Sequence, residues 1–86
     1  VLCGVAGDDE DGRSLAAEMR ARGLAPSALV TLPARRTTTK VRVVTSRNQQ
    51  VARIDYEADG DLDREAEDAV MTAVDRHLDG VGVVLA

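Results

Sequence analysis

"TTTKVRVVTSRNQQVARIDYE", residues 37–57, is the part of the chain that most restricts its fold. Apolar and polar side chains alternate on both sides of the tetrapeptide "SRNQ", as they do in two paired strands. Ser and Asn favour tight local hydrogen bonding, so a turn is expected at this tetrapeptide. The stretch therefore predicts an antiparallel hairpin with strands over residues 39–45 and 50–57.

The hairpin is predicted to have one packed face and one polar face. In its first strand, Val41 and Val43 share a face, and Lys40 and Arg42 point to the other, about 6–7 Å apart. In its second strand, the polar face is expected to hold Gln49, Val51, Arg53, Asp55 and Glu57, and the packed face Ala52, Ile54 and Tyr56. Such a concentration of polar groups needs a reason beyond solubility.

On either side of the hairpin, the hydrophobic pattern predicts two helices and three short strands. The strands are expected over residues 1–6, 27–32 and 81–86. The first helix is expected over residues 12–23, with Asp8 or Asp11 as its N-cap. The second is expected over residues 61–80, with Asp61 as its N-cap. Helices alternating with strands place the chain in the α/β class, with the hairpin as an appended β element.

The composition predicts a thin hydrophobic core. A single domain of 86 residues buries only about 60–65% of the surface that its unfolded chain exposes. Tyr56 is the only aromatic residue, so the core must be built from Ala, Val and Leu without large rings. Both ends of the chain are apolar runs of the kind that neighbouring strands cover in a parallel sheet. Residues 1–86 are therefore expected to be one partial domain, an internal segment of a longer protein.

Charge and cysteine content exclude several classes of protein. A net charge of -4 argues against a nucleic-acid partner, which would require a basic surface. No run is long and apolar enough for a membrane span, and no signal peptide is visible. Cys3, the single cysteine, is expected to be a small buried hydrophobe rather than a nucleophile. These features fit a reducing, cytoplasmic compartment.

Three local features could carry chemistry but have simpler explanations. The stretch "GVAGDDEDG" matches neither common glycine-rich phosphate-binding pattern. The acidic cluster at residues 8–11 lacks the spacing of a calcium loop and is better explained by helix capping. His77 has no partner in sequence for a catalytic role, and an imidazole is favourable near a helix C-terminus. No metal ligand or catalytic residue is assigned to these positions.

The polar hairpin face leaves two interpretations open. Lys40 and Arg42 could bind a phosphate, Arg through its planar fork and Lys as a point charge. Alternatively, they could pair with Asp55 and Glu57 across the hairpin. The amide of Gln50 fits either interpretation.

Two segments resemble known sugar kinases. "GVAGDDEDGRSLAAEMRARGL", residues 4–24, resembles the G-x-x-G-x-D-x-x-G stretch and following helix of ribokinase-type (PfkB family) carbohydrate kinases. The hairpin is similar to the T-K-x-R, N-Q-Q and R-x-D-x-E signature of the kinase domain of ADP-heptose synthases. The resemblance covers essentially the whole chain.

The resemblance implies a fold, a reaction and a set of partners. The fold would be a ribokinase-like, Rossmann-like three-layer α/β fold, whose β lid closes over the sugar and often mediates homodimerisation. The enzyme would use ATP and Mg²⁺ to phosphorylate D-glycero-D-manno-heptose 7-phosphate at O1. The substrate-binding candidates are Lys40, Arg42, Gln50, Arg53, Asp55 and Glu57.

Other parts of the kinase pattern have no counterpart in the chain. These are the glycine-glycine sugar site, the N-x-x-E magnesium motif and the G-A-G-D motif with the catalytic Asp. The 86 residues alone are therefore expected to bind neither ATP nor Mg²⁺ and to be inactive. The alternatives are a non-catalytic interaction module whose hairpin pairs with another copy, and a ribokinase-family kinase for another sugar.

Overall fold

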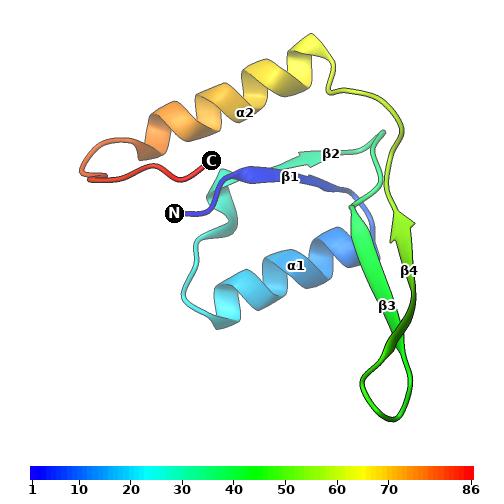
Figure 1. The fold of residues 1–86 in the computed structure, drawn as a ribbon. Helices are drawn as coiled ribbons and strands as arrows, with labels where there is room; N and C mark the ends of the chain where they lie inside the picture. The colour runs from blue at the N-terminus through cyan, green and yellow to red at the C-terminus, as the bar shows by residue number, and fades with distance from the viewer.

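The computed structural model describes all residues from 1 to 86. In chain order, its elements are β1 (Gly4–Gly7), α1 (Glu10–Ala21), the 3-10 turn η1 (Pro26–Ala28), β2 (Leu29–Leu32), β3 (Thr39–Val44), β4 (Gln50–Tyr56) and α2 (Arg64–His77). Strands β1 and β2 pair in parallel, whereas β3 and β4 form an antiparallel hairpin. Helices α1 and α2 lie on opposite sides of the parallel pair, and the hairpin projects from one end of it (Figure 1). The predicted α/β class and the predicted hairpin are confirmed.

Helix α1 begins two residues earlier than predicted, because its N-cap is Asp9 rather than Asp8 or Asp11. The Asp9 carboxylate accepts a hydrogen bond of 2.8 Å from the amide of Gly12. This amide belongs to the first turn, where backbone donors have no partner within the helix. The helix ends at Ala21, two residues before the predicted end, with Arg22 as its C-cap, and Gly23 then turns the chain with a φ of 74°.

Helix α2 begins later than predicted, because its N-cap is Asp63 and not Asp61. Asp63 has an extended backbone, and its carboxylate accepts a hydrogen bond of 2.8 Å from the amide of Ala66. Ala66 and Ala73 are buried, and the helix lies against β2 and η1. Neither helix is long and apolar enough to cross a membrane.

Of the three predicted flanking strands, the structure contains two. Gly4 of β1 pairs with Leu29 of β2, so β1 begins later than predicted and η1 occupies the predicted start of β2. The predicted strand over residues 81–86 is absent, because no neighbouring strand offers its backbone a partner. Its side chains are exposed, with Val83 at 75% and Leu85 at 93% of their maximum.

The buried core is small, as the composition predicted. Only 8 of 86 residues are buried, and the apolar ones are Ala6, Met19, Ala28, Ala66 and Ala73. The radius of gyration is 15.3 Å, compared with about 12 Å expected for a compact domain of this length. The molecule is therefore extended, mainly because the hairpin projects beyond the helices (Figure 1).

One face of the hairpin and one single residue were predicted to be buried but are not. The hairpin face expected to be packed is exposed, with Val41 at 39% and Ile54 at 42% of their maximum, because most of the hairpin projects beyond the helices (Figure 1). Cys3 is half-buried rather than buried, because it precedes β1 instead of lying within a strand.

Candidate functional site

The hairpin gathers five charged side chains on the face that the sequence predicted to be polar. Lys40 lies opposite Asp55, and Arg42 lies opposite Arg53. Directly opposed residues of an antiparallel pair share a face, and Glu57 belongs to the same face because it is two residues beyond Asp55. Five of the six predicted substrate-binding residues are therefore close together.

Lys40 is held by two carboxylates. Its Nζ lies 3.2 Å from Oδ2 of Asp55 and 2.9 Å from Oε2 of Glu57. Hydrogen bonds to Glu57 and then to Asp55 raise the pKa of Lys40 above its ordinary value of 10.5. The cross-strand pairing that the sequence left open is present at this position.

Asp55 also orients Arg53 on its own strand. The Arg53 guanidinium donates from Nε to Oδ1 at 3.0 Å and from Nη2 to Oδ2 at 3.2 Å. Desolvation favours a higher pKa for Asp55, but the hydrogen bonds from Lys40 and Arg53 outweigh it and hold the pKa below its ordinary value of 3.8. Asp55 is therefore a charged carboxylate at neutral pH that fixes both cations.

Arg42 differs from the other two cations of this face. Asp55 binds both Lys40 and Arg53, and Glu57 also binds Lys40. The Arg42 guanidinium, in contrast, forms no hydrogen bond or ion pair with another side chain. It lies directly opposite Arg53, an arrangement in which like charges weaken strand pairing. The face therefore carries an excess of positive charge at the Arg42 position.

Gln50, the sixth candidate, lies opposite Val44 at the turn end of the hairpin. The register shifts between Val43 and Val44, which leaves Val51 as an extra residue in a bulge. The strict alternation expected for residues 49–52 is therefore interrupted at the turn end of the hairpin. The predicted turn is confirmed, with Asn48 in the left-handed region at a φ of 58°.

A hydrogen-bonded cluster, here called the Asp9–Thr37 clasp, fixes the point where the hairpin leaves the α/β layers. Asp9 accepts bonds from the amide of Thr37 at 2.8 Å and from its hydroxyl at 2.6 Å. The Thr37 hydroxyl in turn accepts a bond of 2.8 Å from the amide of Gly7. The bonds from the Thr37 hydroxyl, the Thr37 amide and the Gly12 amide lower the pKa of Asp9 to about 2.

The clasp needs glycine at two positions. A Cβ on Gly7 would lie 2.2 Å from the carbonyl oxygen of Arg35, and one on Gly12 would lie 2.2 Å from the carbonyl oxygen of Gly7. The glycine and aspartate spacing is visible in the sequence, but it does not identify Thr37 as the partner of Asp9. The signal was weak, because Thr37 is separated from Asp9 by 28 positions.

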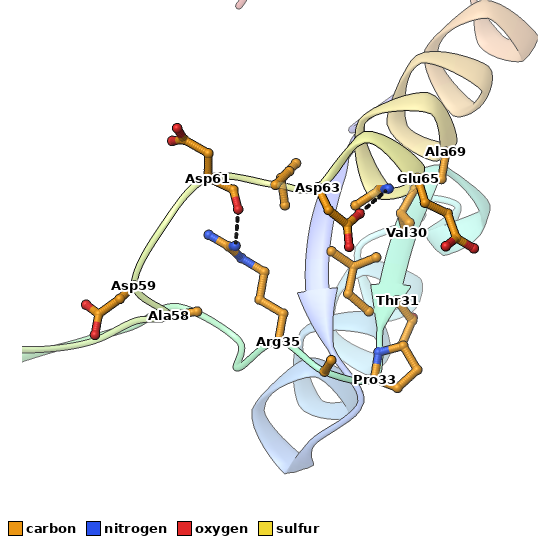
Figure 2. Close-up of a pocket in the computed structure, with 14 residues that line it drawn as sticks. Val30, Thr31, Pro33, Arg35, Ala58, Asp59, Asp61, Asp63, Glu65 and Ala69 are labelled. Atoms are coloured by element: carbon orange, nitrogen blue, oxygen red, sulfur yellow. Dashed lines mark hydrogen bonds between the residues drawn. The ribbon is translucent and has the colours of Figure 1, made fainter.

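A pocket of about 490 Å³ lies beside the carboxyl end of β2, and the sequence did not predict it (Figure 2). Arg35 extends across it and donates to the main-chain oxygens of Gly60, at 3.1 Å, and Asp61, at 3.4 Å. Asp63 and Glu65 line its opposite side (Figure 2). Carboxyl ends of parallel strands are the usual location of ligand sites in α/β sheets. The only sequence signal was the basic loop that contains Arg35.

His77 lies in the last turn of α2, as predicted. Its Nδ1 lies 2.7 Å from the carbonyl oxygen of Ala73, and its Nε2 lies 3.4 Å from the hydroxyl of Ser27. No three His, Cys, Asp or Glu side chains are grouped so that they could hold a metal ion.

The sequence is similar to bacterial proteins named bifunctional protein HldE. It is 33% identical over 86 residues to the protein of Helicobacter pylori (strain G27), 36% identical over 72 residues to that of Wolinella succinogenes, and 37% identical over 84 residues to that of Pelobacter propionicus. These matches cover 99%, 84% and 98% of this chain but only 18%, 15% and 17% of the relatives. No protein-family model and no solved structure matches the chain.

Proposed function

We propose that residues 1–86 are an internal segment of a ribokinase-like kinase domain that phosphorylates D-glycero-D-manno-heptose 7-phosphate at O1. The similarity to proteins named bifunctional protein HldE supports this proposal, together with the resemblance of the hairpin to the kinase domain of ADP-heptose synthases. The observation that carries it is the charged hairpin face, whose T-K-x-R and R-x-D-x-E residues lie together on paired strands.

The position of this face suits a lid over a sugar site. The hairpin follows β2 directly and is anchored by the Asp9–Thr37 clasp at the carboxyl end of β1. In α/β folds, ligands bind outside the carboxyl ends of parallel strands. A hairpin fixed at that edge can cover a substrate there and exclude water from the transferred phosphoryl group.

The chemistry of the face suits a phosphorylated, polyhydroxylated substrate. Guanidinium groups bind phosphate oxygens, and the carboxylates of Asp55 and Glu57 and the amide of Gln50 can accept hydrogen bonds from hydroxyl groups. Phosphoryl transfer depends mainly on such positioning and on charge stabilisation. In this proposal, other parts of the full-length protein bind ATP and Mg²⁺ and supply the residue that accepts the O1 proton.

One consequence is that residues 1–86 alone do not catalyse the reaction. The expected result is no ADP release above background when the isolated segment is mixed with ATP, Mg²⁺ and heptose 7-phosphate. Turnover by the isolated segment would show that the assignment of the missing groups is wrong.

The proposed function is tested with the full-length protein. ADP release is measured with ATP, Mg²⁺ and one of three acceptors: heptose 7-phosphate, fructose 6-phosphate or ribose. The proposal predicts the highest kcat/KM with heptose 7-phosphate and a 1,7-bisphosphate product. Preferential use of ribose or fructose 6-phosphate would instead support a ribokinase-family kinase for another sugar.

A second candidate function, self-association through the hairpin, has its own supporting observation. Val41, Val43, Ile54 and Tyr56 lie on the other face of the hairpin and are each about two-fifths exposed. An apolar face of this kind is typical of a surface that another chain covers. We therefore propose that the full-length protein is a homodimer through this lid element.

The dimer proposal is tested by sedimentation equilibrium of the full-length protein and its Ile54→Lys variant. A charge placed in a dimer interface is expected to shift the protein toward monomer. A Met71→Lys variant is the control, because Met71 is also exposed but lies on α2. A wild-type protein that is monomeric at micromolar concentration would contradict the proposal.

A further inference from the structure

We infer that Arg42 and Arg53 together bind the phosphate monoester of the sugar substrate, and that Lys40 is a positioning residue that does not touch it. This inference rests on the proposed function, because it identifies which part of the hairpin face receives the 7-phosphate. From the sequence alone, Lys40 and Arg42 are the two cations expected to bind the phosphate together.

The first observation is the placement of the two guanidinium groups. Arg42 and Arg53 are direct partners in the β3–β4 register. Side chains opposed in this way start from Cβ atoms about 4.5–5.5 Å apart, so their guanidinium groups can reach one ligand. Two like charges at this separation repel each other, and an anion bound between them removes the repulsion.

The second observation is the charge of the face. Its three cations, Lys40, Arg42 and Arg53, are accompanied by only two carboxylates, those of Asp55 and Glu57, which leaves a net charge of +1. Both carboxylates are already engaged, Glu57 by Lys40 and Asp55 by Lys40 and Arg53. The charge that remains uncompensated is therefore at Arg42.

The third observation is the number of free donors. Arg53 uses Nε and Nη2 for Asp55, so its Nη1 keeps both hydrogens for another acceptor. Arg42 keeps all five of its donors. A phosphate monoester carries up to two negative charges and three terminal oxygens, which matches two guanidinium groups better than a single carboxylate would.

Lys40 has a different role because it is already bound on two sides. Its ammonium lies within 3.2 Å of Asp55 and 2.9 Å of Glu57. These two carboxylates already balance its positive charge, and their negative charges would repel a phosphate placed beside it. Lys40 instead binds Asp55. Asp55 in turn orients the Arg53 guanidinium through Nε and Nη2, which leaves Nη1 free.

The test uses the full-length protein and compares Arg42→Ala and Arg53→Ala with Arg47→Ala as the matched control. Arg47 lies in the turn of the same hairpin, and its one hydrogen bond to a side chain comes from its backbone amide. Binding of heptose 7-phosphate and of unphosphorylated heptose is measured by titration calorimetry without ATP. Inorganic phosphate is titrated separately as a competitor.

The expected result is a loss specific to the phosphate. Arg42→Ala and Arg53→Ala should each weaken heptose 7-phosphate binding by about 10- to 100-fold, the usual effect of losing hydrogen bonds to a charged group. Binding of unphosphorylated heptose should not change, and Arg47→Ala should behave as wild type. Arg42→Lys and Arg53→Lys keep the charge and should recover part of the affinity, which separates a lost contact from a folding defect.

The inference is overturned if the two Ala variants bind heptose 7-phosphate and phosphate as wild type does, or if they weaken both sugars equally. If the wild type ignores heptose 7-phosphate but binds inorganic phosphate in an Arg42- and Arg53-dependent way, the proposed function fails and the phosphate site stands. For Lys40→Met, we expect a raised KM for heptose 7-phosphate with an unchanged kcat. A lower kcat at constant KM would contradict a positioning role.

Discussion

Asp9 is the residue on which the placement of the hairpin most depends. Its carboxylate caps α1 through the amide of Gly12 and binds Thr37 through both the amide and the hydroxyl. One side chain thus joins the start of a helix to the start of the hairpin. The proposed sugar-phosphate site therefore depends on a residue that does not belong to it.

The protonation of Asp9 should contribute to the loss of stability at low pH. Its pKa is lowered from 3.8 to about 2 in the folded protein, so its contribution is complete above about pH 5 and is lost progressively as the pH falls toward 2. Thermal unfolding followed by circular dichroism should show a decrease in Tm over this range. The decrease should be smaller for Asp9→Asn and unchanged for Asp8→Asn; equal pH profiles for wild type and Asp9→Asn would contradict this account.

Gly12→Ala should destabilise the protein although it replaces glycine within a helix. Alanine normally stabilises a helix relative to glycine, by about 1 kcal/mol. Here its Cβ would lie 2.2 Å from the Gly7 carbonyl oxygen, and overpacking of this kind costs about 1–3 kcal/mol. Urea unfolding should therefore give a lower midpoint for Gly12→Ala but not for Gly4→Ala, where a Cβ meets no atom within 4 Å. A Gly12→Ala protein as stable as wild type would contradict the close contact.

At the scale of the elements, the sequence predicted the type of each long element better than its ends. The hairpin and both helices could be predicted because their apolar residues repeat with periods of two and about 3.6. The N-caps could not, because several adjacent aspartates satisfy the same local rule and the choice depends on tertiary contacts. Asp9 is selected by Thr37, which is distant in sequence.

The cap of α2 can be tested directly. Asp63→Ala should cost about 0.5–2 kcal/mol, because the amide of Ala66 loses its acceptor. Asp61→Ala should have little effect, because only the main-chain oxygen of Asp61 accepts a bond, from Arg35. The free energies of unfolding from urea titrations distinguish the two sites. A larger loss for Asp61→Ala would restore the cap predicted from the sequence.

In the candidate site, too, the general character of the surface could be predicted but its individual contacts could not. The polar face could be predicted from alternation, which put Lys40, Arg42, Arg53, Asp55 and Glu57 together. The different role of each residue could not be predicted, because it depends on the strand register and on which cation each carboxylate binds. Lys40 is opposite Asp55 while Arg42 is opposite Arg53, a difference that no spacing within one strand reveals.

At the scale of the whole molecule, the main feature is how much apolar surface the chain leaves exposed. Residues 81–86 and the apolar hairpin face are exposed at opposite ends of an extended molecule, 46 Å in its longest dimension. The composition predicted the small core, but the missing final strand could not be foreseen, because a strand needs a partner as well as a suitable sequence. Both surfaces are consistent with the proposal that the chain is a segment of a larger kinase domain.

The most direct test of the central claim is the steady-state kinetics of the full-length protein with ATP, Mg²⁺ and heptose 7-phosphate, for wild type and Arg42→Ala. The wild type should release ADP in a sugar-dependent way. Arg42→Ala should raise KM for the sugar by about 10- to 100-fold, because charge-assisted hydrogen bonds are lost, and should retain kcat. A folded wild-type protein that releases no ADP in response to this sugar would contradict the account.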